Sequence, residues 1–379
     1  MTAGEKVPGV APVFPDGAAC LVDLGPPAPQ HTEAYRIVAE IPVGMGPEGV
    51  AVDPAGRRAY VSCSRSNAVT VIDLDRLEAV EEIPVGQEPI PAAFDEPTGR
   101  MFCANARSNT ISAIDTRGGN RVHEVEVGEY PAGLGHDPQR RLLLCGDTAG
   151  STVSVVDCDT LERVAVVPAE LGVGSIDVDV ERGLAYCVNF FSASVTMVDV
   201  ERMEPVERIA VGEGPCKVAV NPRSGTAFIA NSLDSTIVRV RLDDRSVIDE
   251  VPVERAPVGV AEAPAGDRFY VCNRGAGSIS IVGADDGREW ARVPVGKGPG
   301  DLAVDPVTGW VLVSNAGSAS LIVVEDLLTG PPADDVTSAP HPLTGQRVPA
   351  FRLPDLEGRI RESREWAEKK YILNFFASW

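Results

Sequence analysis

Apolar and polar positions alternate along most of this chain in short runs that turn-forming residues separate. The run GVAVD (49–53) is followed by RAYVS (58–62), AVTVIDL (68–74) and AVEEIPV (79–85), with Gly, Asp, Asn or Arg-rich turns between them. A period of two places alternate side chains on the two faces of a β-strand, whereas a helix needs a period of 3.6. The pattern therefore predicts four strands in this stretch.

The same four-strand text returns along the chain at a fixed spacing. Lines such as VGMGPEGVAVDP, beginning at Val43, and VGQEPIPAAFDE, beginning at Val85, recur every 42 residues, and a line at Ala169 fills the one gap in the series. Seven copies result. Equivalent strand positions are aliphatic, and one such column reads Val69, Ile111, Val153, Val195, Ile237, Ile279 and Leu321. A period of about 40 to 45 residues with four strands per copy is typical of β-propeller blades, so we expect an all-β, seven-bladed propeller.

The two ends of the repeat region predict how the ring closes. The last copy supplies strands through SASLIVVED (318–326) and then leaves the pattern. The segment YRIVAEIPVG (35–44), which precedes the first full copy, matches the fourth-strand text LEAVEEIPVG (77–86). We expect residues 35–42 to complete the seventh blade beside the last strand, which ties the two ends together and removes an open sheet edge.

The strand text carries a family resemblance. The segment AYVSCSRSNAVTVIDLDRLEAVEEIPVGQEP and its variants AYCVNFFSASVTMVDV and AFIANSLDSTIVRV resemble the YVTN-type β-propeller repeats of bacteria and archaea, over residues 35–330. The tetrapeptide that names these repeats is not present, and its positions read YVSC, MFCAN, LLCGD, YCVN, FIAN, YVCN and LVSN. Members of the family are scaffolds and binding modules of varied context, so the resemblance implies an architecture more than a function.

Composition and charge narrow the choice of partners. The 379 residues carry a formal net charge of −21 at pH 7, which argues against nucleic acid or an anionic membrane surface. No stretch approaches the roughly 18 apolar residues of a membrane helix, and the start, MTAGEKVPGVAPVFPDG, lacks the segments of a signal peptide. We expect a cytoplasmic protein, or a periplasmic or extracellular one if the N-terminus is incomplete.

Three of the eight cysteines are placed for packing. One strand column reads Val61, Cys103, Cys145, Cys187, Ile229, Val271 and Val313, which predicts buried thiols in an aliphatic column. There is no CxxC, CxxCH or Cys/His cluster with zinc spacing, and the four histidines are not in HExxH or HxH contexts. The sequence therefore predicts no metal site, no cofactor and no catalytic triad.

A polar column follows at the end of the second strand of each copy. It reads Cys63, Asn105, Asp147, Asn189, Asn231, Asn273 and Asn315. Asparagine favours turns because its side chain hydrogen-bonds nearby backbone. We expect these side chains to fold back onto the turn that follows, which is a structural role.

Three ionisable residues interrupt the columns of the first strand, which we expect to line the central channel. His136 and Glu262 stand where the other copies have Val or Phe, and Asp177 stands in a column of Ala and Gly. The simplest interpretation is three hydrated channel residues. A sharper one pairs His136 with Asp177 of the next blade.

Loops on one rim offer a candidate binding face. The connections between the second and third strands and those leading into the first strand open on the same side. They carry Arg65, Arg107, Tyr130, Phe190, Phe191, Lys217, Arg274 and Lys297. Arginines can hold carboxylates or other anionic groups, and paired aromatic rings can anchor a partner. The residues predict a site for a protein partner or a small anionic ligand, against the alternative of ordinary solvated loops.

A different pattern follows the repeats. After an N-terminal extension (1–34) and the propeller, residues 331–347 are rich in Pro, Asp, Ser and Thr and are typical of a linker. The text VPAFRLPDLEGRIRESREWAEKKYILNFFASW (348–379) predicts a strand in AFRLPD, a Gly turn, a helical segment and a buried strand in ILNFF, which is the opening of an α/β unit.

This last segment resembles the beginning of a thioredoxin-like redoxin of the disulfide-reductase type. The matching residues are Pro349, Phe351, Leu353, Asp355, Gly358, Asn374, Phe375, Ala377, Ser378 and Trp379, while Phe376 stands where the family often has Trp. In that family the catalytic Cys-x-x-Cys comes directly after the position of Trp379. The resemblance implies a truncated domain without its nucleophilic cysteine.

Three functions are open at this level. The first is a redox protein whose propeller docks a partner and whose full-length form carries a thiol–disulfide oxidoreductase, so that the given chain is inactive. The second is a non-catalytic scaffold that binds through the propeller rim. The third is a propeller enzyme that uses His136, Asp177 and Glu262. No catalytic motif in the sequence supports this third function.

Overall fold

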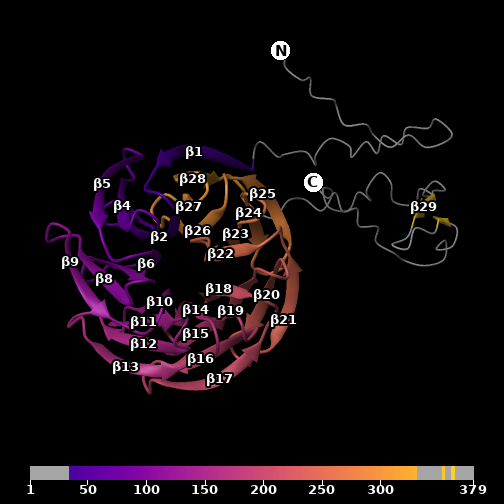
Figure 1. Cartoon of the computed structure of the whole chain (residues 1–379). Coiled ribbons are helices and arrows are strands. Elements are labelled where there is room, and N and C mark those ends of the chain that lie inside the picture. Colours follow the sequence, from indigo (N-terminus) through magenta and orange to yellow (C-terminus); the bar gives the residue numbers. More distant parts are fainter. Residues whose placement is uncertain (1–33, 331–351, 355–359, 363–379) are drawn as a thin grey trace, which may run out of the picture. The chain divides into compact units, whose positions relative to one another are not determined.

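Seven four-stranded antiparallel sheets, the blades, form a closed ring about a central axis (Figure 1). The structure is a computed structural model that describes residues 34–330, 352–354 and 360–362. All regular elements in these ranges are strands, so the predicted all-β, seven-bladed propeller is confirmed. No helix in the described ranges is long and apolar enough to cross a membrane.

Six blades each consist of four consecutive strands. Blade 1 comprises β2 (Pro47–Asp53), β3 (Arg58–Cys63), β4 (Ala68–Asp73) and β5 (Glu78–Pro84), and blade 2 comprises β6 (Pro89–Asp95), β7 (Arg100–Asn105), β8 (Thr110–Asp115) and β9 (Arg121–Glu126). Blade 3 comprises β10 (Pro131–Asp137), β11 (Leu142–Asp147), β12 (Thr152–Asp157) and β13 (Arg163–Pro168), and blade 4 comprises β14 (Val173–Asp179), β15 (Leu184–Asn189), β16 (Ser194–Asp199) and β17 (Glu204–Ala210). Blade 5 comprises β18 (Pro215–Asn221), β19 (Thr226–Asn231), β20 (Thr236–Arg241) and β21 (Val247–Pro252), and blade 6 comprises β22 (Pro257–Glu262), β23 (Arg268–Asn273), β24 (Ser278–Gly283) and β25 (Glu289–Pro294).

The seventh blade takes strands from both ends of the ring. It comprises β26 (Pro299–Val304), β27 (Val311–Asn315), β28 (Ser320–Asp326) and the N-terminal β1 (Tyr35–Pro42). β1 runs antiparallel to β28, with Tyr35 opposite Asp326 and Pro42 opposite Ser320, and it forms the outer edge of the blade in Figure 1. The predicted closure is therefore confirmed: one sheet holds both ends, and the ring has no unpaired seam.

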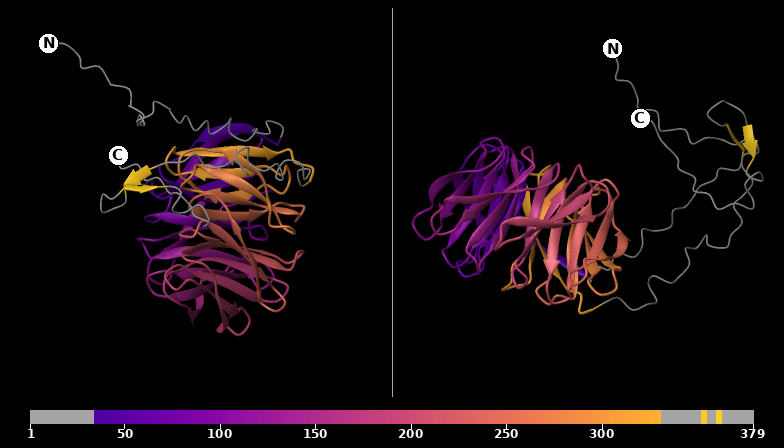
Figure 2. Two further views of the ribbon diagram at one scale, coloured as in Figure 1. Left: turned by 90° about the vertical axis from the view of Figure 1, so that its right-hand side faces the viewer. Right: turned by 90° about the horizontal axis from the view of Figure 1, so that it is seen from below.

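Each blade runs from the axis to the circumference. The first strands lie innermost and contact one another around the ring, and the fourth strands lie outermost (Figure 1). The strands span the ring from one rim to the other (Figure 2). We call the rim at which the first strands begin the start rim; it carries loops such as 43–46 and 64–67. The opposite, end rim carries loops such as 54–57 and 74–77.

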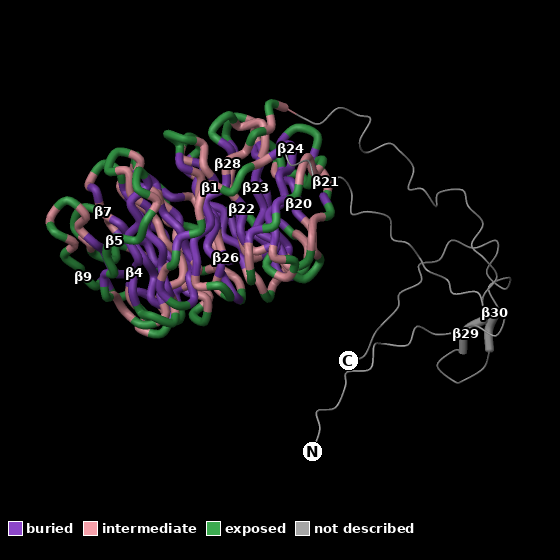
Figure 3. Tube along the Cα trace, turned by 90° about the horizontal axis from the view of Figure 1, so that it is seen from above, coloured by how far each residue is buried: buried purple, intermediate pink, exposed green. Residues whose placement is uncertain are grey.

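The core lies between blades. Ile41 and Leu321 of blade 7 pack with Val61 and Ile72 of blade 1 in one buried cluster, and the other clusters likewise join neighbouring blades. Figure 3 shows the buried strands inside and exposed loops at both rims. In each fourth strand one residue is buried, and these are Ile41, Ile83, Val125, Val167, Ile209, Val251 and Val293. Because each blade covers only its neighbours' faces, every blade needs two neighbours.

The cysteine column is buried as predicted. Cys103, Cys145 and Cys187 are each 0% exposed in the second strand of their blades. Burial raises the pKa of Cys103 and of Cys187 to about 12, so both thiols stay protonated at neutral pH. These side chains act as small core residues.

The polar column has different partners from those predicted. Asn105 donates from Nδ2 to the Ser112 hydroxyl at 2.8 Å, and Asn273 donates to the Ser280 hydroxyl at 2.9 Å. Asp147 accepts the equivalent bond from a hydroxyl of its own third strand at 2.8 Å. The expectation that these side chains bond the following turn is wrong, because strand pairing buries them beside the hydroxyls of the third strand and a buried amide must use the partners within reach.

Arginines on the end rim bond the preceding blade. Arg141 forms two hydrogen bonds to the fully buried Asp95 of blade 2, at 2.7 and 2.9 Å, and Arg57 bonds Asp305 of blade 7 at 2.7 Å. Both arginines have left-handed backbone, with φ of 58° at Arg141 and 51° at Arg57, at a turn position that is Gly in four other blades. Burial would raise the pKa of Asp95, but hydrogen bonds from Arg141 and Thr98 lower it below its usual value.

The C-terminal residues form a separate unit, 332–379. The structure describes in it one antiparallel pair, β29 (Arg352–Pro354) and β30 (Ile360–Glu362). The strand predicted in AFRLPD is present, although its partner β30 was not expected from the sequence. The linker at 331–347, the helical segment and the ILNFF strand lie outside the described residues, as does the extension at 1–33, and the described residues give the redoxin resemblance no support.

The Arg141–Asp95 pair provides a test of the contacts between blades. We expect Arg141→Gly to lower the free energy of unfolding by about 2 kcal/mol at pH 7, since it leaves a buried carboxylate without its main partner. The pKa of Asp95 is lowered in the folded state, so the pair stabilises the fold above the unfolded-state pKa and loses that effect as the pH falls through the folded-state pKa.

Urea unfolding of wild type and variant at pH 7 and pH 3 measures this effect, and the difference should shrink at pH 3. Arg76→Ala is the control, because Arg76 forms an exposed pair with Glu78 at 3.6 Å that should contribute less than about 1 kcal/mol. An equal loss for the two variants would contradict the assignment.

Candidate functional site

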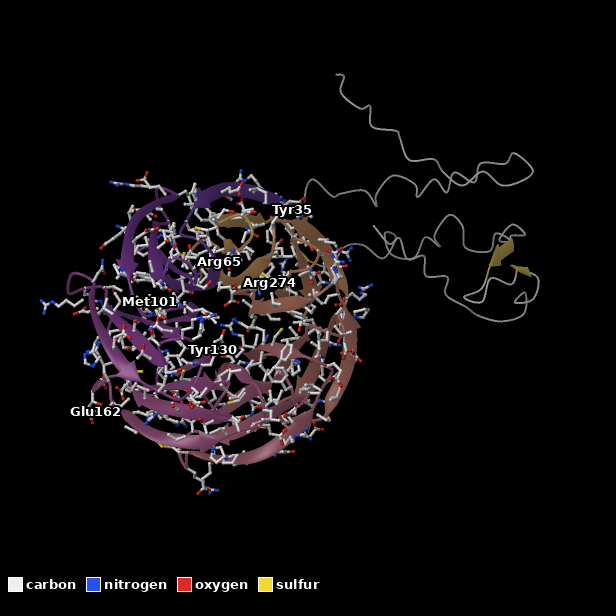
Figure 4. All side chains as sticks on the ribbon, viewed as in Figure 1. Tyr35, Arg65, Met101, Tyr130, Glu162 and Arg274 are labelled. Carbon is white, nitrogen blue, oxygen red and sulfur yellow. The ribbon has the colours of Figure 1, made fainter. Side chains whose placement is uncertain are left out.

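The predicted binding residues gather on the start rim. Their two kinds of loop are joined in every blade by backbone hydrogen bonds, such as Arg65 N to Met45 O at 3.1 Å and Phe191 N to Leu171 O at 3.2 Å. Figure 4 shows Arg65, Tyr130 and Arg274 around the centre of the ring. The sequence was therefore correct that both kinds of loop open on one face.

A cluster of three side chains joins blades 2 and 3 on this rim. Tyr130 donates its hydroxyl to Glu88 Oε1 at 2.7 Å, and Arg107 donates Nε to Glu88 Oε2 at 2.5 Å. Burial would raise the pKa of Glu88, but these two bonds lower it, and the carboxylate in turn raises the pKa of Tyr130. The predicted anion-binding Arg107 is thus already neutralised.

The backbone at this cluster is strained. The residue directly before the first strand of each blade has positive φ, and it is Gly46, Gly172, Gly214 and Gly298 in four blades. Glu88 and Tyr130 occupy the same position with φ of 56° and 51°. A left-handed conformation costs a non-glycine residue about 1 to 2 kcal/mol. In blade 6 Ala256 also has positive φ, 54°, so the turn accepts other residues; at Glu88 and Tyr130 the side-chain contact offsets the cost.

Two ion pairs cross the ring near the axis, each passing over one blade. Lys217 of β18 lies 2.8 Å from Asp301 of β26, and Arg274, in the loop after β23, lies 2.7 Å from Glu48 of β2. The blade between each pair has glycine in its first strand. A Cβ added at Gly259 would lie 3.2 Å from Asp301 Oδ1, so the missing side chain leaves room for the pair.

The same arrangement recurs one blade further on. A Cβ added at Gly300 would lie 3.1 Å from Glu48 Oε2, where the pair with Arg274 passes. Burial by itself would lower the pKa of Lys217, but Asp301 and the more distant Asp177 raise it, so Lys217 is charged at neutral pH. Burial raises the pKa of Glu48 and Arg274 partly offsets that effect.

The three predicted axial residues, all in the described part of the chain, form no ion pair or hydrogen bond with one another. His136 Nε2 lies 3.3 Å from Asp95 Oδ1 of the preceding blade, whereas Asp177 accepts a hydrogen bond from Val220 N of the following blade at 2.7 Å. The expected pair between His136 and Asp177 is therefore wrong. The two residues belong to alternate faces of the first strand, so one side chain points back around the ring and the other points forward.

The protonation of these residues follows from their surroundings. Burial lowers the pKa of His136 more than Asp95 raises it, so the imidazole is neutral at pH 7. Burial raises the pKa of Asp177.

Glu262 ends β22 at the end rim, away from the start-rim residues. In the part of the chain that the structure describes, no three or more His, Cys, Asp and Glu side chains are grouped to hold a metal.

Sequence reasoning missed the carboxylates of this rim: Glu48, Glu88 and Asp301. For Asp301 a signal was present. Its column in the first strand reads Gly49, Pro91, Gly133, Ser175, Lys217, Gly259 and Asp301. Lys217 and Asp301 are the two charged residues in a column of otherwise small residues, which suggests an ion pair. They stand two copies apart in the sequence, and only the curvature of the ring brings them into contact.

Blades 4 and 5 carry an apolar patch on the start rim, formed by Leu171, Phe190, Phe191 and Leu233. Leu171, Phe191 and Leu233 are 64%, 74% and 67% exposed. The rings of Phe190 and Phe191 meet edge to face with centroids 5.2 Å apart. Phe191 lies over Gly172, where an added Cβ would approach its ring to 2.6 Å, so the glycine fixes the place of the ring.

Comparison with known proteins supports the fold. No protein-family model matches the chain, and no curated protein does. Among solved structures it is similar to a chain of Kuenenia stuttgartiensis hydrazine synthase, with a TM-score of 0.64 and 19% identity over 74% of this chain and 95% of that one. At this identity the likeness shows a shared propeller fold and carries no activity across.

The pair that crosses the ring can be tested by a double-mutant cycle. We expect Lys217→Met to lower the free energy of unfolding by about 2 to 3 kcal/mol at pH 7, because Asp301 is left partly buried without its cation. Adding Asp301→Leu should recover most of the loss. Chemical denaturation of the four proteins gives the coupling, and independent, additive losses would show that the two side chains do not interact.

Proposed function

We propose that the propeller is a protein-binding module and that its start rim receives a protein partner. The observation that carries the proposal is the apolar patch, in which three large side chains are between 64% and 74% exposed on neighbouring blades. Grouped exposed apolar side chains are typical of interaction surfaces, and an aromatic ring held in place is the usual anchor of such a surface.

The charges of the rim favour a protein over a small anion. Of the predicted cations, Arg107, Lys217 and Arg274 are each paired with a carboxylate, at 2.5, 2.8 and 2.7 Å. Among the described residues no carboxylate lies within ion-pair distance of Arg65 or Lys297. A small anion would have to compete with the carboxylates already present, whereas a protein surface can match charges of both signs and cover the apolar patch.

A finer proposal assigns the propeller to a redox protein as its docking module. Its support is the redoxin-like sequence of 348–379. In that role the propeller would contribute binding and not thiol chemistry, because burial raises the pKa of Cys103, Cys187 and Cys216 to about 12. Disulfide reduction by the full-length gene product, measured with and without a change in the apolar patch, separates docking from catalysis.

The patch can be tested with a photo-crosslinking residue at position 171 in the full chain, which identifies the partner in cells by mass spectrometry. Calorimetry with the purified partner then compares Phe191→Ser with wild type. We expect Phe191→Ser to weaken binding about 30-fold, which corresponds to about 2 kcal/mol.

Val307→Ser is the matched control, since Val307 is 62% exposed on the end rim, and it should leave the affinity unchanged. Equal affinities of Phe191→Ser and wild type, or a loss confined to Val307→Ser, would overturn the proposal.

A further inference from the structure

The end rim contains a pocket of about 430 Å³ that the proposed function does not use. Loops and strand ends of blades 4 to 7 line it, including Glu181, Pro222, Arg223, Glu262, Pro264 and Pro306. Small-molecule sites occupy roughly 300 to 1,000 Å³, so this pocket suits a compact ligand. It lies on the opposite rim from the apolar patch and therefore raises a separate question.

Glu262 is the residue that the propeller does not require. Its column reads Val52, Phe94, His136, Val178, Val220, Glu262 and Val304. The carboxylate is half-buried, and no donor among the described residues forms a hydrogen bond with it. Gly266 leaves space beside it, since a Cβ added there would lie 2.9 Å from Glu262 Oε1. A half-buried carboxylate without a donor is unfavourable by itself, and a bound donor would remove that penalty.

The charges around the pocket favour a cation. Glu181 and Glu262 contribute two carboxylates, and Asp177 lies close enough behind Glu262 to act on it. The single guanidinium, of Arg223, donates to the carbonyl oxygen of Pro264 at 3.0 Å, and burial raises the pKa of Glu262 by more than this guanidinium lowers it. An anionic ligand would be repelled by three carboxylates, whereas an ammonium group could donate to Glu262.

The remaining lining is apolar. Pro222, Pro264 and Pro306 come from equivalent positions of three consecutive blades, and Val304 and Ala263 also line the pocket. Rigid proline walls offer a preformed surface for an aliphatic chain and no backbone N–H donors. The combination of carboxylates with apolar walls therefore selects a small organic cation over a hydrated metal ion.

We propose that the end-rim pocket binds a small aliphatic amine, with its ammonium group donating to Glu262 and its chain against the prolines. Glu181 of blade 4 lines the same pocket, so a diamine gains a second ion pair. The rest of the pocket is occupied by the methylene groups.

The test uses the full chain and four probes: 1,4-diaminobutane, butylamine, 1-butanol and butyrate. Calorimetry at pH 7 should show binding of both amines, with the diamine tighter, and no binding of the alcohol or the acid. Glu262→Val should weaken diamine binding at least tenfold while the protein keeps its thermal midpoint, because Val stands at this position in four other blades.

Glu262→Gln removes the charge with little change in shape and should also weaken binding, whereas Glu129→Gln removes one charge on the start rim and should leave it unchanged. Phe191→Ser should likewise leave amine binding intact, so failure here and failure of the proposed protein-binding function are distinguishable. Equal diamine affinity in wild type and Glu262→Val, equal weakening by Glu129→Gln, or tighter binding of butyrate than of butylamine would each overturn the proposal.

Discussion

The structure depends on one constraint, which is that no blade can bury both of its faces alone. Each sheet packs against the sheets before and after it, so the apolar columns are satisfied only when the row of blades closes into a ring. The pairing of β1 with β28 closes the row through backbone hydrogen bonds, because one sheet contains the first and the last strands of the propeller. The edges that a linear stack would expose are thereby removed.

Closure also brings the charged residues near the axis within reach of one another. The innermost strands converge on the axis, where the seven copies present equivalent residues at close range and small side chains fit best. Charged residues in these strands meet partners across the ring, as Lys217 meets Asp301 and Glu48 meets Arg274 from the loop after β23. Each pair passes a glycine in the intervening blade, and a side chain at that glycine would obstruct the pair.

The two rims differ in character although one repeat generates both. The start rim combines the Glu88 cluster and the crossing ion pairs with the apolar patch, and it offers a broad surface. The end rim is bound together by arginines that bond buried aspartates of neighbouring blades, and between blades 4 and 7 it leaves a pocket with a carboxylate that no protein donor contacts. The broad surface suits a macromolecule and the pocket suits a small molecule, so the rims support separate proposals.

The sequence alone determined the blade number, the place of each strand to within one or two residues, the closing strand, the buried cysteine column and the face on which the binding loops gather. All of these follow from two features of the sequence. The first is the alternation of apolar and polar residues within each copy, and the second is the 42-residue spacing between copies. Only the tertiary structure decided that Asn105 bonds a third-strand hydroxyl, that His136 and Asp177 point away from each other, and that Lys217 reaches Asp301, which is 84 positions distant. Those contacts depend on the curvature of the ring and on which neighbouring blade each face of a strand contacts. A repeated sequence gives the spacing of the blades but not which face contacts which neighbour.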